Sequence, residues 1–187
     1  MSGERGPVPN SFQTVPQISI VQFFPSPRTI RHKKMHAIYE ANRRRVYSFA
    51  FWMTDNEPMA EHLTERTFVR AFSTFDQPTE EQIDKALLRE LKKEAQVTLE
   101  PLQLCCAAAT EVNGVRHNTL RVDLECALVQ LPHTERMIFC MHDGDGYDHA
   151  RIARTLGIGE DESRHGLHQA RLRIRELVSS MRAELRA

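Results

Sequence analysis

A run of arginine, histidine and glutamine side chains between residues 164 and 173 has the chemistry to contact nucleic acid. The arginine guanidinium can donate two parallel hydrogen bonds to guanine, and histidine or glutamine can donate to bases or phosphates. Apolar residues recur through the same segment at helical spacing, which predicts one amphipathic helix with a basic face. The candidate DNA-contacting residues are Arg164, His165, His168, Gln169, Arg171 and Arg173.

The segment before this helix predicts how it is positioned. A short apolar pattern ends at Leu156, and Gly157 follows where a helix can end in a left-handed residue. Asp161 is expected to be the N-cap of the second helix. Residues 148–181 therefore predict a helix-turn-helix, a unit that lays its second helix in the DNA major groove. The alternative is an ordinary helical hairpin with a solvated basic face.

Composition limits the class of protein without deciding its function. The chain has 187 residues, of which 41% are hydrophobic, and the charges of its 25 basic and 25 acidic residues cancel. Residues 28–45 and 164–182 are basic, whereas residues 55–65 are acidic. Because a DNA-binding protein needs a basic face and not a basic average, this distribution is compatible with DNA binding.

Cysteine use and hydropathy predict a reduced, cytoplasmic setting. The chain has four cysteines, two of them adjacent at Cys105 and Cys106, and this spacing does not indicate a disulfide framework. The apolar run at residues 18–24 is too short for a signal peptide, and no run approaches the ~20 apolar residues of a membrane span. We expect no membrane association.

Upstream, three apolar periodicities predict three helices. The first runs from Arg31 to about residue 54, and the second from about Glu57 to residue 72. The third is expected to run to about Glu94, with Thr79 as its N-cap and Glu81 and Gln82 in place for a capping box. Short loops between the three predict a small helical bundle.

The predicted fold is all-α, with two small helical domains. Residues 1–30 are expected to form a disordered arm, and residues 31–95 the three-helix bundle. Residues 96–121 are expected to be a linker with a short hairpin that turns at Asn113 and Gly114. Residues 122–187 are expected to form a four-helix domain, with one helix capped by Asp123, another over residues 134–142, and then the helix-turn-helix.

The C-terminal segment resembles the fourth domain of RNA polymerase sigma factors of the extracytoplasmic-function type. The matching features are Leu131-Pro132, Glu135-Arg136, Gly146-Tyr147, Ile152-Ala153, Leu156-Gly157-Ile158, and Leu167-His168 with Ala170-Arg171. Residues 38–53 and 60–72 are similar to the sigma second domain, so the resemblance covers nearly all of residues 32–181. It implies that the last helix reads the minus-thirty-five promoter element.

The same resemblance implies roles for the N-terminal helices. The second helix would dock on the polymerase core through Glu61, His62, Glu65 and Arg66, and the third would stand at the minus-ten element. The chain departs from the family pattern at His62 and Arg66. Leu87 also stands where the family has a tryptophan that traps unstacked bases.

The leading hypothesis is a sigma-like transcription initiation factor that binds RNA polymerase core, double-stranded promoter DNA and, as a further partner class, an anti-sigma protein. One alternative is a DNA-binding regulator that has lost polymerase docking. Another is a protein-interaction module built on the two helical domains. We expect no catalytic residue, no cofactor and no metal site. The Asp143-Gly-Asp-Gly146 stretch is interpreted as a turn. Cys105 and Cys106 could hold a metal together with His117, but they are interpreted as buried small apolar residues.

Overall fold

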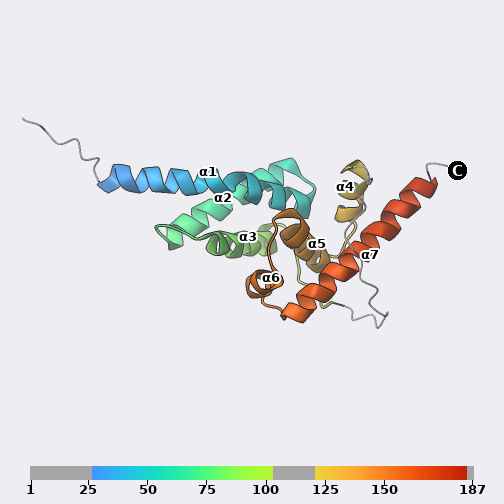
Figure 1. The fold of residues 1–187 in the computed structure, drawn as a ribbon. Helices are drawn as coiled ribbons and strands as arrows, with labels where there is room; N and C mark the ends of the chain where they lie inside the picture. The colour runs from blue at the N-terminus through green and yellow to red at the C-terminus, as the bar shows by residue number, and fades with distance from the viewer. Residues whose placement is uncertain (1–26, 103–120, 185–187) are drawn as a thin grey trace, which may run out of the picture.

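A computed structural model describes residues 27–102 and 121–184 of the chain. Helices account for all the regular structure in these two ranges, which confirms the all-α fold (Figure 1). Helices α1–α3 precede the gap and are called the N-terminal bundle below, and α4–α7 follow it and are called the C-terminal bundle. No helix in the described part of the chain is both long and apolar enough to cross a membrane.

In the N-terminal bundle, α1 (Pro27–Thr54) pairs with α2 (Glu57–Thr74), and α3 (Glu80–Glu94) packs on both. The prediction of a disordered arm over residues 1–30 is wrong at its end, because residues 27–30 belong to α1. Proline is compatible with a first helical turn, where its missing N–H costs nothing. Only the second half of α1 is well buried, through Val46, Phe49, Ala50 and Met53.

Local capping explains where α2 and α3 begin. The Asn56 side chain accepts a hydrogen bond from the Met59 N–H (2.9 Å) at the start of α2. The predicted capping box of α3 is present, with Thr79 and Gln82 each accepting from the other's backbone N–H. These bonds satisfy N–H groups that a helix start otherwise leaves open, and the predicted end of α3 at Glu94 is also confirmed.

The C-terminal bundle comprises α4 (Arg121–Val129), α5 (His133–Phe139), α6 (His149–Leu156) and α7 (Glu160–Glu184). The capping prediction for Asp123 is wrong, because α4 already begins at Arg121. The single helix predicted over residues 134–142 is also wrong in part. After Phe139 the chain continues as a π-helix, η1 (Cys140–Gly144), in which the Asp145 N–H donates to the Cys140 carbonyl five residues back (3.0 Å).

Helix α7 begins at Glu160, so the prediction that Asp161 is its N-cap is wrong. The Glu162 carboxylate instead accepts the Gly159 N–H (2.7 Å), and three acidic residues fill the first turn, where the helix dipole favours negative charge. Inside α7, a Cβ on Gly166 would lie 2.5 Å from Ile138 Cδ1 and 3.1 Å from Leu102 Cδ1. The glycine therefore permits α7 to approach α5 and the segment after α3 closely.

A buried carboxylate connects the two bundles where α3 meets α6. Asp84 in α3 accepts hydrogen bonds from Arg45 in α1 and from Arg151 Nη2 in α6 (3.0 Å), and its side chain is 3% exposed. The Arg151 guanidinium also lies 3.6 Å from the Tyr147 ring centroid and hydrogen-bonds Glu80. We call Asp84, Arg45, Arg151, Glu80 and Tyr147 the Asp84 network. Because these residues come from both bundles, the network fixes their relative placement.

A second connection is made by Arg136 in α5. Its Nη1 donates to the Met53 carbonyl at the end of α1 (3.3 Å), and its Nη2 donates to the Val129 and Leu131 carbonyls at the end of α4 (3.0 Å for Leu131). Helix C-termini leave carbonyls without intrahelical partners and carry partial negative charge. One buried arginine thus caps two helices from different bundles.

Several predictions lie outside the described residues. These are the arm over residues 1–26, the hairpin and its turn at Asn113 and Gly114, and the interpretation of Cys105, Cys106 and His117. The end of the predicted linker that is described carries Val97, which is buried and packs with the core.

Candidate nucleic-acid interface and the α1–α2 groove

Helices α6 and α7 form the predicted helix-turn-helix. Asp148 caps α6 by accepting the Arg151 N–H (2.7 Å), and Gly157 ends it in the left-handed region with φ of 76°. Ile158 is half-buried in the angle between the two helices. The predicted core positions of α7 are buried at Leu167, Ala170 and Ile174, so the turn geometry and the inward face of the motif agree with the sequence prediction.

Three of the predicted DNA-contacting residues lie on accessible parts of α7. Arg164 is 55% exposed in its side chain and pairs within the first turns with Glu160 (3.2 Å) and Asp161 (3.1 Å). His168 and Gln169 are half-buried along the same helix. Exposed pairs at these spacings are worth a few tenths of a kcal/mol, so Arg164 can exchange its partners for phosphate or base at little cost.

Arg171 is held differently, by a residue distant in the sequence. Its Nε donates to Asp143 Oδ2 (3.0 Å) and its Nη2 donates to Asp143 Oδ1 (2.6 Å). The two side chains are 21% and 22% exposed. Burial alone would raise the pKa of Asp143, but the hydrogen bonds from Arg171 and His142 more than offset it and hold that pKa below its ordinary value. The carboxylate is therefore charged at neutral pH.

His165 and Arg173 lie on the side of α7 that faces α5. Arg173 Nε lies 3.1 Å from Glu135 Oε2, and the Glu135 side chain is 6% exposed. Burial raises the pKa of Glu135, while Arg173 and His165 act in the opposite direction. His165 Nε2 is buried. The structure thus separates these two residues from Arg164 and Arg171, and it gives them a place in the packing of α7 on α5.

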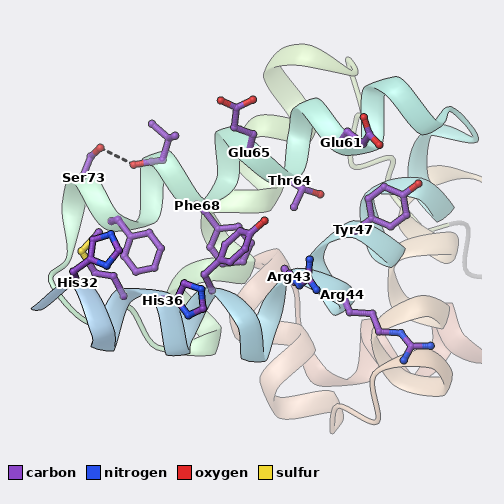
Figure 2. A pocket seen from close by; sticks show the side chains of 14 residues that line it. His32, His36, Arg43, Arg44, Tyr47, Glu61, Thr64, Glu65, Phe68 and Ser73 are labelled. Atoms are coloured by element: carbon purple, nitrogen blue, oxygen red, sulfur yellow. Dashed lines mark hydrogen bonds between the residues drawn. The ribbon is translucent and has the colours of Figure 1, made fainter. Parts of the chain in front are cut away.

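A groove of about 1010 Å³ runs between α1 and α2 (Figure 2). The rings of Tyr39 and Phe68 meet edge to face inside it, with centroids 4.8 Å apart, and Phe72 stacks beside Phe68 at 6.1 Å. Two histidines of α1, His32 and His36, also line this groove. An aromatic floor with polar rims is typical of surfaces that receive another protein.

The structure divides the predicted polymerase-contacting residues between two faces of α2. Glu61 and Glu65 are exposed and line the groove. Arg66 faces α3, where its Nε lies 3.9 Å from the buried carboxylate of Glu90. The hydrogen bond and charge of Lys93 lower the pKa of the Glu94 carboxyl, and the nearby His62 adds a smaller effect in the same direction. The two positions that depart from the family pattern therefore lie outside the groove.

Sequence reasoning missed a basic stripe on α3. Lys85, Arg89, Lys92 and Lys93 are exposed, on the face opposite the buried Ile83 and Leu91. Their spacing of four, three and one residues was visible in the sequence as the complement of the apolar pattern. Leu87, at the position of the family tryptophan, is 3% exposed and belongs to the core. The α3 surface can therefore attract phosphate, but Leu87 cannot stack on a base.

Comparison with known proteins agrees with this geometry. Residues 121–174, from α4 through most of the α7 face described above, match the family described as Sigma-70, region 4. A relative from Mycolicibacterium smegmatis, ECF RNA polymerase sigma factor SigE, is 26% identical over 153 residues, which are 75% of this chain and 60% of the relative. The chain is therefore similar to extracytoplasmic-function sigma factors, and the family match lies in its C-terminal bundle.

The fold of this chain also has a solved counterpart. It is similar, with a TM-score of 0.57 and 17% identity, to a chain in the structure of the sigma factor RpoE in complex with the anti-sigma factor NepR from Bartonella quintana. The similarity covers 79% of this chain and 98% of that one, and it extends over both bundles. This chain spans 60% of the length of the mycobacterial relative.

Proposed function

We propose that this protein is a sigma-type initiation factor, with no catalysis of its own, that binds RNA polymerase core through the α1–α2 groove and promoter DNA through α7. The observation that supports it best is the helix-turn-helix with exposed Arg164 and oriented Arg171, in a segment that matches Sigma-70 region 4. The basic stripe of α3 adds a second surface for the DNA backbone. We further propose that the domains are residues 31–95 and 122–187, with α1 extending to residue 27.

The polymerase half of the proposal predicts a loss of binding on one face of α2. We expect Glu61→Ala/Glu65→Ala to weaken capture of bacterial core polymerase by roughly tenfold, because both carboxylates line the groove and charged groups at an interface guide docking. His62→Ala is the matched control from the same helix, and it should retain capture because His62 faces Glu94. Equal losses in both variants, or no capture by the unaltered chain, would contradict docking at the groove.

The DNA half predicts unequal effects along α7. We expect Arg164→Ala and Arg171→Ala each to weaken binding to a promoter duplex by about 1–3 kcal/mol where a base contact is lost. Arg173→Ala should have a smaller effect, because this arginine is directed toward Glu135 of α5 and away from Arg164 and Arg171. Fluorescence anisotropy at two salt concentrations measures both affinity and its salt dependence. If Arg173→Ala proved the most damaging, the DNA-reading face of α7 would be misassigned.

A second candidate function is a DNA-binding regulator without polymerase docking, which the departures at His62 and Arg66 favour in the sequence. Their position toward α3, away from the groove, weakens that argument. Transcription from a selected promoter by core polymerase plus this protein alone would eliminate the regulator. Because the solved structure of RpoE contains the anti-sigma factor NepR, we also propose an anti-sigma protein as a partner class, with the aromatic groove as one surface available to it.

A further inference from the structure

The π-helix η1 places an acidic side chain against the recognition helix. The wider turn is visible in the bond from the Asp145 N–H to the Cys140 carbonyl five residues back (3.0 Å). Such insertions are rare and recur at functional sites. Within this turn, Asp143 contacts Arg171 of α7, 28 residues later in the sequence.

Asp143 is itself fixed from both sides. Its Oδ1 lies 2.8 Å from His142 Nδ1, and the His142 ring stacks on His149 with centroids 4.8 Å apart. His149 Nδ1 in turn lies 2.9 Å from the hydroxyl of Ser163, which is fully buried in α7. The contacts therefore form a closed ring that begins and ends on α7. A carboxylate held in this way can fix the orientation of the arginine that it binds.

The pairing uses only one edge of the guanidinium. Asp143 takes the Nε–H and one N–H of Nη2, so the two N–H groups of Nη1 and the second of Nη2 lie outside this pair. The Nη1/Nη2 edge is the fork that can donate two parallel bonds to O6 and N7 of guanine in the major groove. The arginine therefore keeps a base-reading edge while its rotation is restricted.

We propose that Asp143 is a positioning residue that holds Arg171 with its free edge set to read a guanine, and so increases the sequence selectivity of α7 more than its total affinity for DNA. This inference rests on the proposed function of α7 in binding promoter DNA. Arg164 provides the contrast, because its partners Glu160 and Asp161 belong to its own helix and are 49% and 99% exposed. Those carboxylates cannot restrict an arginine to one orientation as a half-buried bidentate pair does.

The test uses the full-length chain and a duplex library with a randomised window, from which the preferred sequence is selected. Affinities are then measured for the selected duplex, for each single-base substitution, and for an unrelated duplex of equal length. We expect Asp143→Asn to reduce discrimination at one G·C pair by roughly tenfold. Binding to the unrelated duplex should stay equal or improve, because one negative charge has been removed. Arg171→Lys should lose the same discrimination while keeping its charge.

Two controls separate positioning from a structural tie. Glu160→Gln removes the same charge from a partner of Arg164, and it should raise all affinities together without changing discrimination. In an Arg171→Lys background, Asp143→Asn should cause no further loss of discrimination. Unchanged discrimination in Asp143→Asn, or a parallel fall for selected and unrelated duplexes together with a lower Tm, would overturn the role of Asp143 alone. If the unaltered chain bound no duplex even at low salt, the proposed function would fail as well.

Discussion

Replacing Arg136 with methionine should lower the free energy of unfolding by about 3 kcal/mol. The guanidinium is 6% exposed and donates to the carbonyls of Met53, Val129 and Leu131. Methionine fills a similar volume but donates nothing, so these carbonyls at the ends of α1 and α4 would lose a common donor where water has little access. Burial lowers the pKa of Arg136, and a guanidinium still remains charged at neutral pH.

Urea denaturation followed by circular dichroism measures this effect. Arg121→Met is the matched control, because Arg121 is 86% exposed and pairs only locally, with Glu125 at 2.6 Å, among its described contacts. We expect the control to change the unfolding free energy by less than about 0.5 kcal/mol. If the two variants proved equally stable, the carbonyls around Arg136 would be satisfied in some other way and its capping role would be wrong.

Short-range signals made much of this fold predictable. The capping box of Thr79 and Gln82 placed α3 to the residue, and Gly157 placed the end of α6, because each signal depends on residues within a few positions of one another. The buried faces of α3 and α7 followed from apolar spacing in the same way. Prediction failed at the start of α7, because two acidic residues there can cap a helix. Glu162 accepts the Gly159 N–H, and Asp161, the predicted N-cap, is exposed.

The residues that join distant parts of the chain could not be predicted. Nothing near Arg136 or Asp84 in the sequence indicates that they would be buried among partners 39 to 83 positions away. The π-helix could not be predicted either, because its residues contact distant parts of the chain, as Asp143 contacts Arg171. A glycine inside a helix ordinarily costs about 1 kcal/mol relative to alanine, and the role of Gly166 is visible only in the structure, where Ile138 and Leu102 lie against it.

The candidate site was predicted in outline and refined in detail. Composition and spacing identified Arg164 and Arg171 as DNA-contacting candidates, and the structure leaves Arg164 exposed and holds Arg171 against Asp143. The same reasoning predicted that Arg173 also contacts DNA, because the sequence around a basic residue does not show which acidic residue will pair with it. The Glu135 side chain that takes Arg173 is nearly 40 residues earlier and belongs to another helix.

Asp84→Asn should cost about 3 kcal/mol of stability, because it removes the buried carboxylate that pairs with both Arg45 and Arg151 where the bundles meet. Burial disfavours the charges of Arg45 and Arg151, but Asp84 more than offsets this and raises the pKa of both above the ordinary arginine value. Asp145 cannot fully replace it, because its carboxyl lies 3.9 Å from Arg45 Nη1, too far for a hydrogen bond. Among the described residues, Arg45 would then keep the longer contact with Asp145, and Arg151 would keep its exposed partner Glu80.

The expected loss should be local to the contact between α3 and α6. Amide hydrogen exchange in Asp84→Asn should therefore accelerate in α6 more than in α2, which packs on α1 and α3 away from the network. Glu80→Gln is the matched control: it also removes a carboxylate bound to Arg151, but Glu80 is 60% exposed, so the cost should stay below about 1 kcal/mol. Equal costs in the two variants would mean that burial adds nothing to the Asp84 pair. A uniform rise in exchange across both bundles would mean that Asp84 supports the whole fold and not the contact between them.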